Sequence, residues 1–202
     1  DWTQNVDDAG RWYEKTSLVD HDYDTGSGRV LKFTGSGSTT ATLKTEKVTD
    51  TVITGTFSHE QMDTINYCNP IVGFCLSTPI TTYIKTATTH NAYVVMFNRH
   101  TSTNYISIWQ VYGGVVLNLR NRAYNFGADD LGTKYSFEID FDSSTGVIDV
   151  YVWKTDTETK PAEPTVSGTA TTILPAGYVA IAHQSGSGTA IHYWYDFEVS
   201  GT

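Results

Sequence analysis

Residues 134–153, "KYSFEIDFDSSTGVIDVYVW", have the pattern of two strands joined by a tight turn. Apolar and polar side chains alternate on both sides of the turn, which is the pattern of strands that bury one face. The turn itself, "DSSTG", supplies the Asp and Gly that such connections favour. Three acids, Glu138, Asp140 and Asp142, then share the polar face of the predicted hairpin.

Strand signals of this kind recur along the whole chain. They come every 8 to 12 residues or so, separated by Gly, Ser, Asn, Asp and Pro, and no segment sustains the apolar spacing of a long helix. We therefore expect an all-β protein, a two-sheet antiparallel β-sandwich (jelly roll) of about 12–14 strands, with residues 1–202 as a single domain. Residues 82–88, "TYIKTAT", are among the predicted strands. The Trp-containing first segment, residues 1–15, is expected to pair with the aromatic last strand.

Charge and hydropathy exclude several classes of partner. The 202 residues carry a formal net charge of −9 with acids and bases scattered, so no basic stripe for nucleic acid exists. No apolar run approaches the roughly 18 residues of a membrane-spanning helix. The chain begins with Asp1 rather than Met, and we expect a mature or excised segment of a longer, extracellular or surface-exposed protein.

Two cysteines, Cys68 and Cys75, stand in "YCNPIVGFC". Their spacing suggests a disulfide that closes a small loop, with two buried free thiols as the alternative. A zinc site is not expected, because the sequence has no HExxH or His-x-His motif and no histidine close to the cysteines.

A calcium site is a further possibility near the amino terminus. Asp20, Asp22 and Asp24 alternate in "DHDYDTGSG", where carboxylates and carbonyls can surround Ca²⁺. The stretch is no EF-hand, because Leu31 occupies the twelfth position. An ordinary acidic turn is the alternative interpretation.

The order of motifs in the second half of the chain resembles a known family. "LGTKYSFEIDFDSSTGVIDVYVW", a polar loop and "PAGYVAIAHQSGSGTAIHYWYDFEVSG" are similar to the concanavalin A-like lectin/glucanase superfamily, in particular to its laminin-G-like jelly-roll modules. The resemblance implies a sandwich fold and, often, a carbohydrate ligand on a sheet face. It is strongest over residues 70–201.

The acids of the hairpin raise the question of catalysis, because laminarinase-type members of that superfamily carry Glu-x-Asp motifs. Their final Glu, the general acid, is replaced here by Asp142. Glu138 and Asp142 would stand about 13 Å apart on one strand, too far for the pair of about 5–5.5 Å in a retaining enzyme. We predict no catalytic residue.

Alternation in residues 91–99, 104–112 and 115–122 predicts a binding face instead. If these strands are neighbours, one face gathers an aromatic, amide and guanidinium set: Trp109, Tyr105, Asn98, Asn118, Arg120 and Arg122. A flat ring stacks on the apolar face of a sugar while amides and guanidinium bind its hydroxyls. The alternative is a buried Trp109 beside arginines that only solvate the sheet.

The sequence thus predicts a non-catalytic carbohydrate-binding or adhesion module. Two other classes stay open. One is a glycoside hydrolase or polysaccharide lyase, for which Arg120, Arg122, His100 and Gln110 are the residues to consider. The other is a structural subunit of a cell or virion surface. The expected partner is a glycan, and other domains of a longer protein are possible neighbours.

Overall fold

The computed structural model describes residues 12–13, 19–25, 29–35, 38–61, 67–80, 83–85, 90–100, 103–126, 131–186 and 190–201. These ranges hold fourteen strands: β1 Trp12–Tyr13, β2 Val19–Asp24, β3 Arg29–Gly35, β4 Ser38–Val48, β5 Thr51–Gln61, β6 Tyr67–Leu76, β7 Ala92–His100, β8 Tyr105–Tyr112, β9 Val115–Ala123, β10 Lys134–Asp142, β11 Val147–Lys154, β12 Val166–Thr169, β13 Gly177–Ser185 and β14 Ala190–Gly201. In this part of the chain, no helix is long and apolar enough to cross a membrane.

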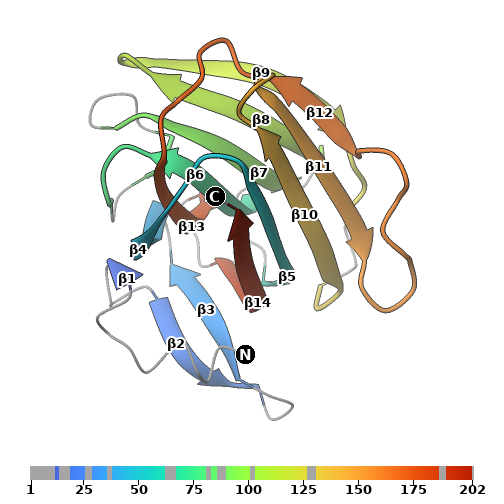
Figure 1. The fold of residues 1–202 in the computed structure, drawn as a ribbon. Helices are drawn as coiled ribbons and strands as arrows, with labels where there is room; N and C mark the ends of the chain where they lie inside the picture. The colour runs from blue at the N-terminus through green and yellow to red at the C-terminus, as the bar shows by residue number, and fades with distance from the viewer. Residues whose placement is uncertain are drawn as a thin grey trace.

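The strands form two antiparallel sheets packed face to face. The first sheet has the order β1-β4-β13-β6-β7-β8-β9, and the second has the order β12-β11-β10-β5-β14-β3-β2. Figure 1 shows β10 and β11 of the second sheet in front of β7 and β8 of the first. The predicted all-β sandwich is confirmed.

The core lies between the sheets and is rich in aromatic rings. The hairpin of β10 and β11 contributes Phe137, Ile139 and Phe141 with Ile148, Val150 and Val152, so the predicted alternation is confirmed. Phe57 at the centre contacts rings of both sheets, among them Phe97 at 4.7 Å between centroids. Each such side chain stabilises the fold by roughly 1.5–3 kcal/mol through its burial.

A second, smaller hydrophobic cluster lies on the outer face of the first sheet, the face turned away from the second sheet. Its sheet residues include Ile71, Val94 and Met96, and Ile80 and Ile84 from the β6–β7 connection cover them. We call the described residues of this connection, 77–80, 83–85 and 90–91, the cover segment. The sequence predicted a strand at residues 82–88, but Ile84 and Lys85 form a turn in the structure. The apolar side chains of Ile80 and Ile84 pack onto the face of the sheet, so this connection covers the sheet rather than extending it.

The predicted disulfide is wrong. Cys68 and Cys75 are not bonded to each other, and both are buried on β6. Seven steps along a strand at roughly 3.3 Å each separate their Cα atoms by about 23 Å, whereas a disulfide requires less than about 7 Å. Cys75 sits at a β-bulge with φ 53°, which turns its side chain inward beside Phe74.

The pairing of the first segment with the last strand stays a prediction, because only Trp12 and Tyr13 of that segment are described. The last strand, β14, lies between β5 and β3. Trp12 and Tyr13, the described part of the first segment, pair with β4 of the other sheet. The remaining residues of that segment lie outside the described ranges.

Candidate functional site

The candidate site lies on the outer face of the first sheet. It is the part of that face next to the cover segment that this segment does not cover. Gly73 on β6 allows the close approach of this segment, because a Cβ there would overlap the end of the Ile84 side chain. Tyr83 and Lys85, the neighbours of Ile84, stand beside the open part of the face. The segment thereby builds one wall of a pocket.

This pocket has a volume of about 230 Å³ and is formed by ten side chains from four neighbouring strands and the cover segment. We call it the aromatic pocket. Its lining residues are Tyr67, Asn69, Tyr83, Lys85, Met96, Asn98, His100, Tyr105, Trp109 and Gln184.

Aromatic rings form one side of the aromatic pocket. Tyr67 stacks on His100 with 5.2 Å between ring centroids, and Tyr105 lies 5.7 Å from His100 on its other side. The cross-strand register explains the row, because Tyr67 is opposite His100, and Asn98 is opposite Tyr105. Burial raises the pKa of Tyr105 and lowers the pKa of His100, so both groups are uncharged at neutral pH.

Amide side chains form the floor of the aromatic pocket. Asn69 Nδ2 donates to Gln184 Oε1 at 3.2 Å, and its Oδ1 accepts from the backbone N–H of Arg99. Asn98 Nδ2 donates to Ser107 Oγ at 2.9 Å and to the carbonyl of Met96 at 3.0 Å. These bonds hold the amides in fixed orientations in a nearly dry environment.

Trp109 lies on this outer face, as the alternation predicts, and it is half-buried. Its indole N–H donates to Ser107 Oγ at 2.8 Å. The ammonium of Lys85 lies 3.2 Å from the centroid of its ring, a cation–π contact that covers one ring face. Burial lowers the pKa of Lys85 and raises the pKa of Tyr83 to about 12. Trp109 is thus a wall of the pocket with one ring face already covered by Lys85, and Tyr105 is a second half-buried ring of the same lining.

Of the residues predicted to bind a ligand, Trp109, Tyr105 and Asn98 line the aromatic pocket. Asn118 is opposite Trp109 on β9, outside the lining, and its Nδ2 donates to Asn121 Oδ1 at 2.7 Å.

Arg120 and Arg122 do not lie on this face. A β-bulge at Leu119 shifts the register of β9, so that Arg120 is opposite Ile108 and Arg122 is opposite Ile106, both of which are core residues. The arginines therefore point toward the second sheet, yet they are exposed because β9 is an edge strand. They line a separate groove of about 1000 Å³ along β12, together with Asp149, Tyr151 and others. We call it the edge groove.

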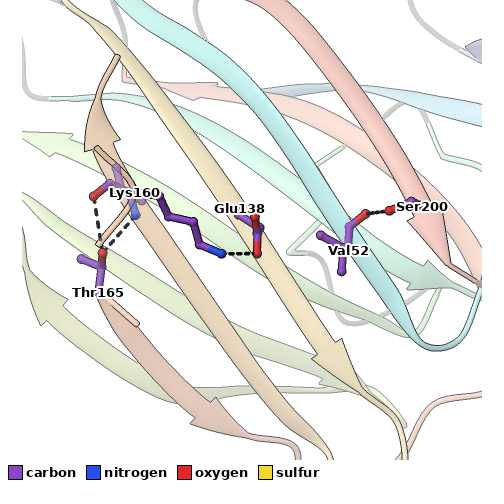
Figure 2. A network of polar contacts seen from close by, with 6 residues as sticks. Val52, Glu138, Lys160, Thr165 and Ser200 are labelled. Carbon is purple, nitrogen blue, oxygen red and sulfur yellow. Dashed lines mark hydrogen bonds and ion pairs between the residues drawn. The ribbon is translucent and has the colours of Figure 1, made fainter. Parts of the chain in front are cut away.

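The three acids of the hairpin lie on the outer face of the second sheet, on the opposite side of the molecule. Glu138 forms an ion pair of 2.7 Å with Lys160 from the 155–165 loop (Figure 2). Asp142 caps the turn by accepting bonds from Ser144 and Thr145, and these bonds lower its pKa. Burial, followed by the charges of Glu138 and Asp149, raises the pKa of Asp140. Two of the three acids therefore have a structural role.

The candidate calcium ligands Asp20, Asp22 and Asp24 belong to β2, an edge strand, rather than to a turn. Their side chains lie outside the described part of the structure. A calcium site at these residues stays a prediction.

A different set of metal-binding side chains meets inside the sandwich. One ligand atom from each of Cys68, His183 and His192 lies within 4.8 Å of the other two, and all three residues are buried. Burial lowers the pKa of His183 to about 4 and that of His192 well below its ordinary value, so both imidazoles are neutral. We call these residues the interior cluster.

Sequence reasoning missed Tyr67, Asn69, Tyr83, Lys85 and Gln184 as pocket residues. Asn69 and Gln184 are opposite each other on β6 and β13, a pairing of distant segments that no local pattern reveals. Tyr83 and Lys85 were placed in a predicted strand, whereas the described residues 83–85 contain a turn. These residues could not be predicted because the sequence does not show which strands are neighbours.

Comparisons with known proteins agree on the fold. No family model matches the sequence, and no curated protein matches it either. Among solved structures, the exoplasmic/lumenal domain of VIP36 in its Ca²⁺/Man3GlcNAc-bound form is similar with a TM-score of 0.65 and 11% identity, over 86% of this chain and 80% of that one. The carbohydrate binding module CBM66 from Bacillus subtilis gives a TM-score of 0.62 and 9% identity over 89% and 90%. A Bacteroides ovatus mixed-linkage glucan GH16 protein, in complex with a product, gives 0.61 and 8% over 96% of both chains.

These similarities define the class of fold. The chain has the fold of the concanavalin A-like lectin and glucanase superfamily, as the sequence predicted. That fold is shared by lectins, carbohydrate-binding modules and GH16 glucanases, so the function has to be argued from the site.

Proposed function

We propose that this protein is a non-catalytic carbohydrate-binding module that holds a sugar in the aromatic pocket. The observation that carries the proposal is the combination of a tyrosine–histidine row with three oriented amides in one depression of the outer face. Aromatic rings stack on the apolar face of a pyranose, and amides both donate to and accept from its hydroxyls. The carbohydrate ligands named for VIP36 and CBM66, which share the fold, support the same class of ligand.

The size of the aromatic pocket suggests how the glycan is bound. About 230 Å³ is less than the roughly 300–1,000 Å³ of sites for drug-sized ligands, so the pocket suits one sugar ring rather than a chain. We therefore propose recognition of a terminal or branching residue, with Tyr105 as the stacking ring. Lys85 adds one positive charge to the rim.

A binding role is favoured over hydrolysis by the location of the acids. No Asp or Glu is among the ten residues that line the aromatic pocket. Glu138 and Asp140 lie on the opposite side of the molecule, where Glu138 is paired with Lys160. A glycosidase needs two carboxyl groups flanking the sugar bond. Such a module would act on an extracellular or cell surface, which is part of the same proposal.

The test is a glycan array followed by calorimetry with the best ligand. We expect Tyr105→Ala to weaken binding about fivefold, because a stacking contact contributes on the order of 1 kcal/mol. Gln184→Ala should weaken it by a similar factor through a lost hydrogen bond. Circular dichroism and melting curves establish that each variant is folded.

Two control variants change charged residues on other surfaces. Arg120→Ala combined with Arg122→Ala alters the edge groove, and Glu138→Gln combined with Asp140→Asn alters the acidic face. Both should retain binding within about twofold. Loss of binding in the arginine variant, with full affinity in Tyr105→Ala, would move the site to the edge groove. Release of reducing sugar that stops in the acid variant would replace binding by hydrolysis.

A further inference from the structure

The interior cluster brings three metal-binding side chains together from both sheets. Cys68 on β6 and His183 on β13 belong to neighbouring strands of the first sheet, and His192 on β14 belongs to the second. Their exposed fractions are 0%, 2% and 0%. We propose that they form a structural site for a transition-metal ion of zinc type, which links the two sheets.

The distances between the donor atoms are close to those that a metal imposes. His183 Nδ1 and His192 Nδ1 are 2.9 Å apart, and Cys68 Sγ is 4.0 Å from His192 Nδ1. Tetrahedral Zn²⁺ with ordinary bond lengths holds nitrogen donors about 3.3 Å apart, and nitrogen and sulfur about 3.6 Å apart. Movements of a few tenths of an ångström bring these two pairs to that geometry, and the widest pair, at most 4.8 Å, closes by about 1 Å.

The hydrogen bonds around the cluster orient His183 as a ligand. Its Nε2 lies 3.3 Å from the carbonyl oxygen of Gly35, which also accepts from Ser185 Oγ at 2.7 Å. Donation from Nε2–H to this carbonyl leaves Nδ1 with a free lone pair directed at the cluster. A backbone carbonyl that fixes the far nitrogen is the usual support for a metal-binding histidine.

The surroundings explain why a metal is needed. Phe33 stacks on His192 at 5.0 Å between ring centroids, and Trp194 contacts it edge-on. Without a metal, the two Nδ1 atoms share one hydrogen bond of 2.9 Å, and the Cys68 thiol has a long contact of 3.8 Å to the carbonyl of Ile191. Two imidazoles and a thiol in such an apolar interior are costly unless a stronger interaction compensates. A shared metal supplies it, and the thiol proton leaves to solvent when the thiolate binds.

The chemistry of the donors indicates the ion. Thiolate with imidazole suits Zn²⁺, and Cu⁺ takes the same donors. The seal around the cluster makes the role structural, because no substrate can reach it. It also means that the ion is loaded while the chain folds.

Cobalt is the probe for this test, because Co²⁺ replaces Zn²⁺ and reports a thiolate ligand by a charge-transfer absorption band. The protein is unfolded in denaturant with chelator, refolded with Co²⁺ or Zn²⁺, and freed of excess ion. We expect about one metal per chain by elemental analysis, the charge-transfer band with Co²⁺, and a melting temperature about 5–10 °C above that of protein refolded in chelator.

Matched variants make the test specific. Cys68→Ser should remove the charge-transfer band, and His183→Ala should lower the metal content at least tenfold. Cys75→Ser is the control, because Cys75 is equally buried on the same strand and lies outside the cluster. It should retain both signals. The proposal is overturned if wild-type protein refolded with Zn²⁺, Co²⁺ or Cu⁺ retains less than about a tenth of an equivalent, or if Cys75→Ser loses the band while Cys68→Ser keeps it.

Discussion

The two cysteines illustrate how one strand determines the chemistry available to its side chains. Cys68 belongs to the interior cluster, while Cys75 occupies a bulge whose backbone places it beside Phe74. Burial, followed by the charge of Asp50, raises the pKa of Cys75 to about 12. A thiol this hard to ionise is a poor nucleophile, because the thiolate is the reactive form.

Alkylation of the cysteines tests this arrangement. In native protein at pH 8 we expect neither cysteine to react with iodoacetamide within an hour, since both are buried thiols. In denaturant without reductant both should react completely, which mass spectrometry detects as two added groups. Absence of labelling in denaturant would instead indicate a covalent bond between sulfur atoms.

Arg120 and Arg122 show how one extra residue in a strand changes the face on which the following side chains lie. Alternation from Val115 predicts them on the Trp109 face, and the first part of β9 obeys it, with Asn118 opposite Trp109. The extra residue at Leu119 reverses the remaining positions. No property of Leu119 in the sequence distinguishes a bulge from regular pairing, so the error could not be avoided there.

Whole strands were more predictable than their irregularities. The hairpin of β10 and β11 has strict alternation and a turn with Asp142 and Gly146, and its faces follow from the sequence alone. The cover segment could not be predicted, because "TYIKTAT" has the composition of a strand. Its turn depends on Gly73, because the lack of a Cβ there leaves room for the Ile84 side chain on the outer face of the first sheet.

Gly177, at the start of β13, gives a test of the bulge in β6. A Cβ there would overlap the carbonyl carbon of Cys75 and approach the backbone oxygen and nitrogen of Leu76 to 2.5 and 2.6 Å. Backbone atoms at a bulge cannot move aside as a side chain can. We expect Gly177→Ala to lower the free energy of unfolding by about 3 kcal/mol, at the upper end of overpacking effects, as measured by urea denaturation.

The control for this substitution is Gly168→Ala in β12. There the nearest atom is the end of Ile108 at 3.3 Å, a side chain that can adjust. We expect a change of less than about 1 kcal/mol. Equal losses in the two variants would show that crowding against the bulge is not the cause.

Across the whole molecule, the core is aromatic at its centre and polar at one end. His59, His183 and His192 are buried there, together with Arg99. The number of strands and the composition predicted the sandwich, because fourteen short strands have few other ways to bury their apolar faces. The polar end was not predictable: His192 is 9 residues from His183 and 124 from Cys68, and only the two-sheet topology brings them together.

The buried histidines predict how stability depends on pH. Burial, followed by the positive charge of Arg99, lowers the pKa of His59 to about 3. In the unfolded chain a histidine has a pKa near 6.5, so between these values the unfolded state binds the additional proton. The contribution of such a histidine to the free energy of unfolding is therefore fully present above about pH 6.5. It falls as the pH falls below it, by about 1.4 kcal/mol per pH unit for each such histidine.

Urea denaturation of metal-free protein at pH 7.5, 6 and 5 measures this slope. His59→Phe, placed among Phe57, Phe126 and Tyr135, should show a shallower loss below pH 6.5 than the wild type. The comparison is of slopes, so a constant change in stability from the larger ring does not affect it. Identical slopes would mean that His59 is protonated in the folded protein.

The bulge in β9 has a consequence for how these molecules behave in crowded solution. β9 is the last strand of its sheet, and an outermost strand offers its unpaired backbone groups to any other chain. Only Val115–Asn118 precede the irregularity, and Val115 and Leu117 are exposed apolar residues. Beyond it, Arg120 and Arg122 bring two like charges to the rim, which repel the same strand of a second copy. The bulge thus confines the strand edge available for edge-to-edge aggregation to the four residues 115–118.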